Sequence, residues 1–172
     1  GFRDGRNAQA FPSFGSERMG APVVAFCRID DREIRTREPI AEPDALIVQD
    51  ATLLHQVDLF SGLRPAGWIV INSSRTFDEV GVGALAARFR HDRLLTVPAT
   101  ELALRHIGRP IPNTVLLGGF CAASGIVSLA ALEQAIRERF TGETARGNVA
   151  AAREAHEWVA SEMRELADAT AD

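Results

Sequence analysis

The sequence predicts an α/β fold in which a mostly parallel sheet is flanked by helices and followed by a helical C-terminal part. Three short apolar runs, at 45–48, 67–72 and 94–97, are each followed by residues with helical spacing. Continuous apolar runs are typical of strands that are buried on both faces, as in parallel sheets. At 172 residues with 46% hydrophobic content, the chain is long enough to bury a core, and we expect one domain over 1–172.

A β-hairpin is expected before the first buried strand. Residues 23–29 are rich in β-branched and aromatic side chains, which favour a strand. Asp30 and Asp31 favour a turn, after which 33–37 is expected to return as a short second strand.

Helices are expected after each buried strand and throughout the C-terminal part. Those that follow strands cover residues 52–63, 77–90 and 100–107. Pro98 ends the third strand, and beyond Pro112 the pattern is helical only. Ser128 is a suitable N-cap there. The C-terminal helices are expected at 114–123, 128–140 and 148–167.

Composition excludes several classes of partner and chemistry. The formal net charge of -4 argues against nucleic acid, which binds basic surfaces. All 19 basic residues are arginine, so Schiff-base chemistry on lysine is excluded. No apolar run reaches the roughly 20 residues that span a bilayer, and the first ten residues lack the apolar core of a signal peptide, so we expect a cytoplasmic protein without a membrane span.

The possible metal ligands are scattered along the chain. The two cysteines are far apart in sequence and form no C-x-x-C pair, and the four histidines show no ligand spacing. These residues are Cys27, Cys121, His55, His91, His106 and His156. Because an iron-sulfur cluster normally takes four cysteine ligands, we expect no metal or cofactor to be bound by this chain alone.

Polar residues follow two of the buried strands. Asp50 follows the first strand, and Asn72 and Ser73 end the second. The carboxyl ends of parallel strands form the functional edge of such sheets, so these side chains are candidates for binding a ribose or another polar ligand, or for autonomous catalysis. Asp and Asn at strand ends also cap the helices that follow, and we favour this capping role.

The segment 10–22 has an unusual composition. It holds two glycines, two prolines, two phenylalanines and an adjacent Glu-Arg pair, which is too irregular for a helix and too apolar for a solvated loop. Either it contacts a partner or ligand through Arg18, or it packs on the core with a local ion pair between Glu17 and Arg18. The candidate loop residues are Ser13, Phe14, Gly15, Ser16, Glu17 and Arg18.

This segment, AFPSFGSERMGAPV, closely resembles the hallmark of the gamma subunit or gamma domain of the pyruvate:ferredoxin (2-oxoacid:acceptor) oxidoreductase family. Met19 departs from the second arginine that is common there. Further matches follow in the family's order, and the resemblance covers about residues 9–159. They are the strand at 44–50, the run 67–73, the run 112–118 with Asn113 and Gly118, and Asn148.

The resemblance implies a Rossmann-like α/β domain that acts as a scaffold within a larger enzyme. Such complexes oxidatively decarboxylate a 2-oxoacid, for example pyruvate or phenylglyoxylate, to an acyl-CoA, and pass electrons to ferredoxin or NAD. Thiamine diphosphate, Mg and [4Fe-4S] clusters would belong to alpha-, beta- and delta-type partner subunits, with coenzyme A as a substrate. Loops of the gamma part would help to enclose the coenzyme A channel.

Family members usually begin with a strand and a Gly-x-Gly-Gly-Gln-Gly turn, and this sequence contains neither. Either this segment has been removed, or the chain has a shortened gamma domain with an incomplete sheet that leaves one strand uncovered. The alternative reading, a free-standing Rossmann-like nucleotide-binding module, would need a glycine-rich dinucleotide turn with an acidic residue about 20 positions later. No such turn is visible in the sequence.

Overall fold

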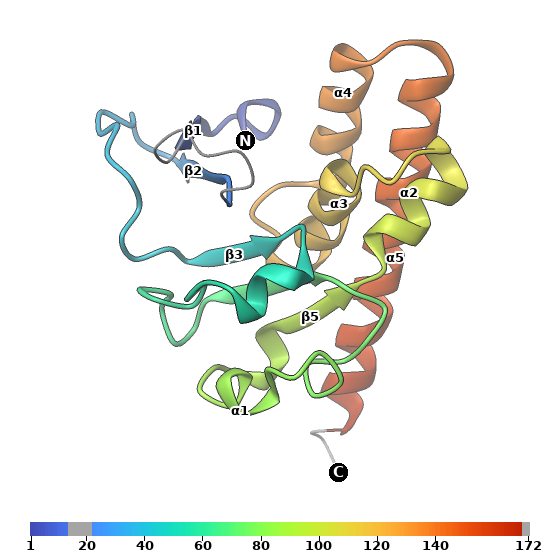
Figure 1. Ribbon diagram of the computed structural model, residues 1–172. Helices are drawn as coiled ribbons and strands as arrows, with labels where there is room; N and C mark the ends of the chain where they lie inside the picture. Colours follow the sequence, from blue (N-terminus) through green and yellow to red (C-terminus); the bar gives the residue numbers. More distant parts are fainter. Residues whose placement is uncertain (14–21, 170–172) are drawn as a thin grey trace.

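A computed structural model describes residues 1–13 and 22–169 (Figure 1). Its strands are β1 (Asn7–Ser13), β2 (Val24–Asp30), β3 (Ala45–Val48), β4 (Trp68–Asn72) and β5 (Leu94–Val97). Its helices are α1 (Gly83–Ala86), α2 (Ala99–Ile107), α3 (Asn113–Ser124), α4 (Leu129–Arg139) and α5 (Gly142–Ala169). Three short 3-10 helices add to these, namely η1 (Phe2–Asp4), η2 (Ala51–His55) and η3 (His91–Arg93).

The central sheet is parallel, with the strand order β3-β4-β5. This confirms the predicted parallel sheet and its three strands, and in the edge strand β3 only Val48 is buried. Side chains of β4 alternate between two apolar clusters: Val70 lies in one, and Ile69 and Ile71 in the other. Both faces of the sheet are therefore covered, which explains why the strands read as continuous apolar runs.

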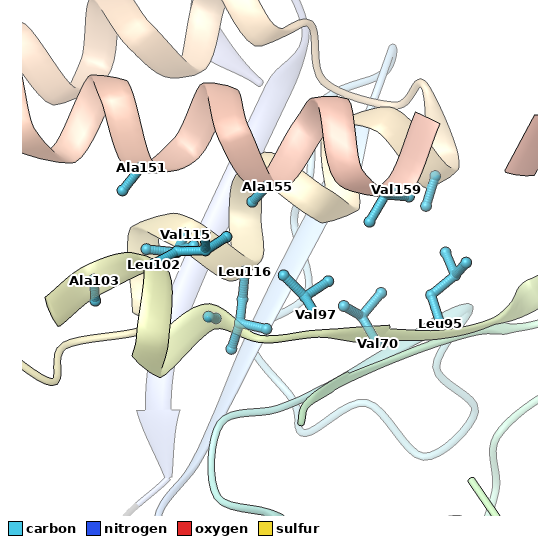
Figure 2. Close-up of a cluster of buried hydrophobic side chains, with 12 residues drawn as sticks. Val70, Leu95, Val97, Leu102, Ala103, Val115, Leu116, Ala151, Ala155 and Val159 are labelled. Atoms are coloured by element: carbon cyan, nitrogen blue, oxygen red, sulfur yellow. The ribbon is translucent and has the colours of Figure 1, made fainter. Parts of the chain in front are cut away.

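The two faces are covered by different kinds of structure. On one face α2, α3 and α5 pack over Val70, Leu95 and Val97, which are fully buried (Figure 2). On the other face the cover consists of η2 and irregular segments between 56 and 89. Only the first face has the extended helical cover that the sequence predicts.

The predicted helices 52–63 and 77–90 are wrong for most of their length. Helix η2 ends at His55, and α1 has a single turn at Gly83–Ala86. Thr76 and Glu79 form the reciprocal hydrogen bonds of a helix start, but Gly81 then adopts a φ of 80°, which interrupts the helix. The apolar residues of these segments are buried against the sheet without forming continuous helices.

The hairpin is also different from the prediction. Strand β2 pairs antiparallel with β1, which precedes it in sequence, and the segment 33–37 is not a strand. Phe11 and Phe26 occupy opposite positions, and their ring centroids lie 5.5 Å apart. The segment 33–37 has only Ile34 as an apolar residue, so it offers little to pack against β2.

The C-terminal helices confirm the prediction with one change of boundary. Ser128 caps α4 by accepting a hydrogen bond from the amide of Ala131 at 3.1 Å. Helix α5 begins at Gly142 rather than at residue 148, and it packs on α2, α3 and α4 (Figure 1). Asn148, expected as the first residue of this helix, lies inside it and is buried.

Candidate functional site

The carboxyl edge of the sheet is tied together by Asn72. Its side-chain amide donates to the carbonyl of Gln49, at the end of β3, and to the hydroxyl of Thr100, each at 2.8 Å. Its carbonyl accepts from the backbone amide of Thr100 at 3.1 Å, near the start of α2. Asn72 therefore uses its donors and its acceptor to join β3, β4 and α2.

Asp50 and Ser73 also serve the local backbone. Asp50 caps η2 by accepting hydrogen bonds from the amide and hydroxyl of Thr52, at 2.9 and 2.7 Å. These bonds hold the pKa of Asp50 below its usual value. Ser73 exchanges side-chain hydrogen bonds with the backbone of Arg75. The strand-end residues thus act as caps and cross-links in this structure.

Gly118 and Asn148 of the family motif lie where α3 packs on α5, and Asn113 is the first residue of α3. Asn113 accepts a hydrogen bond from the amide of Thr114 at 2.7 Å. The Thr114 hydroxyl donates to the side-chain carbonyl of Asn148, whose amide donates to the carbonyl of Thr144 at 2.8 Å. These bonds satisfy the polar side chain of buried Asn148.

Gly118 lets the two helix backbones approach closely. A Cβ atom placed on it would lie 2.1 Å from the carbonyl oxygen of Ala152 on α5. Gly119 faces Val97 and Val159 with more room, because a Cβ there would lie 3.0 Å from the nearest side-chain atom. Gly118 is therefore required by packing between α3 and α5.

The candidate loop is only partly described. Ser13 is the last residue of β1 and is paired with Val24 of β2. Phe14, Gly15, Ser16, Glu17 and Arg18 lie outside the described residues. The predicted roles of Glu17 and Arg18 stay predictions.

The 3-10 helix η1, which precedes the β1–β2 hairpin, is anchored to the helical part through polar contacts. Asp4 accepts hydrogen bonds from the amide and hydroxyl of Ser128, at 2.9 and 2.6 Å, which lower the pKa of its carboxyl. Arg3 pairs with Glu138 on α4. The hairpin leaves Val23 and Val24 exposed, by 69% and 46%. Cys27 on β2 is also exposed.

The described residues do not fit a metal or cluster site. Over 1–13 and 22–169, no group of three or more His, Cys, Asp or Glu side chains is placed to hold a metal ion. Cys27 lies exposed on β2, whereas Cys121 is buried on α3, and burial raises the pKa of its thiol to about 11. In the same part of the chain, no helix is long and apolar enough to cross a membrane.

Fold and site together define a Rossmann-like α/β domain whose polar residues at strand ends and helix crossings support its packing. The chain belongs to the pyruvate ferredoxin/flavodoxin oxidoreductase family, whose model matches residues 1–158. This confirms the family that the sequence motifs indicate.

Relatives show the same membership over most of the chain. It is 44% identical to the "Pyruvate/ketoisovalerate oxidoreductases common subunit gamma" of Thermococcus litoralis, over 91% of this chain and 83% of that protein. It is also 44% identical to the "Pyruvate synthase subunit PorC" of Methanothermobacter thermautotrophicus, over 91% of this chain and 81% of that protein.

Solved structures confirm the fold. The pyruvate oxidoreductase subunit PORC of Thermotoga maritima matches with a TM-score of 0.74 and 35% identity, over 91% of this chain and 82% of that chain. The gamma subunit of a keto/oxoacid ferredoxin oxidoreductase from Geobacter sulfurreducens matches with a TM-score of 0.62, over 93% of this chain and 84% of that chain. The latter is 23% identical and bears on the fold alone.

Proposed function

We propose that this chain is the gamma subunit of a cytoplasmic 2-oxoacid:acceptor oxidoreductase that converts a 2-oxoacid such as pyruvate to its acyl-CoA. The observation that carries the proposal is the 44% identity, over 91% of the chain, to a subunit named for pyruvate and ketoisovalerate oxidoreductases. Alpha-, beta- and delta-type partners hold thiamine diphosphate, Mg and [4Fe-4S] clusters, and electrons leave to ferredoxin or NAD.

The chain's own part in this activity is that of a scaffold. Support comes from the described residues. Asp50 and Asn72, the polar residues at the strand ends, cap and cross-link the fold, and no group of described side chains is placed to bind a metal ion. In such a division of labour the bond-making chemistry belongs to cofactors on other chains. We assign substrate choice to those chains as well.

The proposed contact with partners is the β1–β2 hairpin with the loop that joins its strands. Its exposed Val23 and Val24 would be covered by a partner, which would remove apolar area from water. A two-stranded hairpin is only marginally stable by itself, so a partner surface would also stabilise it. The loop residues Glu17 and Arg18 would then face the coenzyme A channel.

Purification of the tagged chain from its native cells tests the subunit assignment. We expect the thiamine-, Mg- and cluster-bearing chains to co-purify with it, together with 2-oxoacid oxidation that depends on coenzyme A. A chain that elutes alone, without that activity, would contradict the proposal.

Alkylation tests the hairpin contact. Iodoacetamide should label Cys27 in the free chain and fail to label it in the complex, because the hairpin is covered there. Cys121 serves as an internal control, since its buried side chain is inaccessible to the reagent in both samples. Equal labelling of Cys27 in both samples would place the hairpin outside the interface.

Substitution of Arg18 separates the two roles of the loop. If Arg18 reaches a coenzyme A phosphate, Arg18→Ala should raise the KM for coenzyme A and leave the KM for the oxoacid unchanged. If Arg18 holds the interface, the variant should lose partner chains during purification. Wild-type assembly with wild-type kinetics would exclude both roles.

The alternative of a free-standing nucleotide-binding module has less support. In Rossmann-like sheets a nucleotide lies at the carboxyl edge, and here Asn72 joins neighbouring elements across that edge by three hydrogen bonds. Calorimetric titration of the chain with NAD and ATP tests this alternative directly.

A further inference from the structure

The α4–α5 pair carries a groove whose charged lining is entirely arginine. It has a volume of about 350 Å³ and is lined by Arg137, Ala145, Arg146, Val149, Ala150 and Arg153. Its lining residues belong to the last turn of α4 and the first half of α5. These two helices lie side by side in Figure 1. The family motif and the strand-end residues have no part in it.

Two of the arginines are held in place by one carboxylate. Glu133, whose side chain is 9% exposed, accepts from Arg137 Nη2 at 3.0 Å and from Arg153 Nη2 at 2.8 Å, and it also accepts from Arg153 Nε. The shared carboxylate brings these two guanidinium groups together across the helix pair. Their arrangement is therefore set before any ligand arrives.

Most donors of these arginines are available to a ligand. A guanidinium has five N–H donors, and in the described part of the chain the side-chain hydrogen bonds involve one nitrogen of Arg137, two of Arg153 and one of Arg146. The side chains of Arg137, Arg146 and Arg153 are exposed by 54%, 71% and 54%. These arginines can therefore donate hydrogen bonds to further carboxylates without any conformational change to expose them.

The third arginine has a partner that it can exchange. Arg146 pairs with Glu143, whose side chain is 95% exposed, and such a surface pair contributes little free energy. Glu157 lies close enough to Arg153 to affect its pKa, but it does not line the groove. A carboxylate entering the groove would replace Glu143 at Arg146 at little cost.

The spacing of the arginines favours a chain of acids over a single anion. Arg146 and Arg153 are seven residues apart on α5, which corresponds to about 10 Å along the helix axis. One phosphate group is too small to bridge that distance along the helix, whereas alternate residues of an extended segment lie about 7 Å apart and can place successive carboxylates there. The small side chains Ala145 and Ala150 leave room for its backbone.

We propose that this groove docks an acidic segment of a partner polypeptide, through carboxylates that bind Arg146 and the Arg137–Arg153 pair. The inference rests on the proposed function in so far as a subunit has partner chains. The surface is separate from the hairpin contact, so it would be a second point of attachment.

Fluorescence anisotropy with labelled decaglutamate and the purified chain tests the docking site. We expect saturable binding that weakens as salt rises from about 50 mM to about 500 mM. Arg146→Glu should weaken it at least about fivefold, because an attractive contact becomes repulsive. This variant leaves Glu133 and its two arginines intact, so the fold should be retained.

The matched control is Arg32→Glu, which makes the same charge change at a side chain that is 93% exposed and remote in sequence from α4 and α5. It should change the affinity by less than about twofold. Equal weakening by both variants would overturn the proposal, since net charge would then be responsible.

Two competing ligands test which chemical class of ligand the groove binds. Full displacement of decaglutamate by inorganic phosphate at an equal concentration would indicate a small-anion site, and equally tight binding of a single-stranded oligonucleotide would indicate a general polyanion surface. Either result would overturn the proposal. Failure of the chain to co-purify with partners would reject the proposed function while leaving this binding result intact.

Discussion

The hydroxyl of Thr114 on α3 donates a hydrogen bond to the side-chain carbonyl of Asn148 on α5, and Asn148 is only 4% exposed. Because the amide of Asn148 is bound to the carbonyl of Thr144, the pair joins α3 to an internal turn of α5. A motif residue that the sequence predicts at the start of a helix therefore lies inside that helix and links it to α3.

Breaking this pair should destabilise the fold without changing surface charge. Asn148→Ala should lower the free energy of unfolding by about 2 kcal/mol, since it leaves the half-buried Thr114 hydroxyl without its acceptor. Thr114→Val should have a similar effect. In urea unfolding, the double variant should lose less free energy of unfolding than the sum of the losses in the two single variants. Losses that add fully would show that Thr114 and Asn148 are not energetically coupled.

Gly118→Ala should be strongly destabilising even though alanine favours helices. The new Cβ would lie 2.1 Å from the carbonyl oxygen of Ala152, so α3 and α5 would have to separate. We expect a loss of about 2 to 3 kcal/mol, seen as a lower Tm. Gly119→Ala is the matched control on the same helix, because the closest atoms to its Cβ would be side-chain atoms of Val97 and Val159, with the carbonyl oxygen of Ala155 at 3.8 Å. Equal losses in both variants would contradict the assignment.

Glu133 should make stability depend on acid pH. Its hydrogen bonds with Arg153, and then with Arg137, hold the pKa of its carboxyl below the usual value. A lowered folded-state pKa gives stability that is present above the unfolded value, near 4.5, and lost as pH falls through the folded value. Glu133→Gln should cost about 1 to 2 kcal/mol at pH 7 and should weaken this dependence. Parallel curves for both proteins between about pH 5 and about pH 3 would argue against it.

Glu162 should have the opposite effect. Burial raises the pKa of its carboxyl to about 7, and the charge of Glu165 adds to the increase. Since the folded state then holds the proton more tightly, stability falls as pH rises from about 4.5 to about 7. At pH 8, Glu162→Gln should be more stable than the wild type by about 1 kcal/mol, a figure discounted for the solvent exposure of this side chain. Melting curves at pH 5 and pH 8 check this, with Glu165→Gln as a control that should give a smaller gain.

The sequence predicted the sheet because its strands are buried on both faces. The apolar runs at 45–48 and 94–97 match β3 and β5, and 67–72 matches β4 to within one residue. Ser128 was recognisable as a cap because its hydrogen bond to the amide of Ala131 is local. The capping role favoured for Asp50 was readable for the same reason.

Only the tertiary structure decided which strand pairs with β2 and whether the two segments 52–63 and 77–90 form helices. β1 was missed because it contains Pro12 and has no continuous apolar run. Its pairing with β2 depends on contacts such as that between Phe11 and Phe26 across the hairpin. The segments 52–63 and 77–90 have helical spacing, but the sheet can bury their apolar residues in irregular conformations, and Gly81 with its positive φ interrupts the second.

By itself the sequence determined the family, the buried strands and most of the C-terminal helices, because each leaves a local pattern of residues. The roles of Asn148 and Gly118 and the arginine groove were decided by the packing of α3, α4 and α5. These features join residues that are distant along the chain. Hydrophobic periodicity shows that a helix has a buried face, but it does not show which backbone or side chain that face will meet.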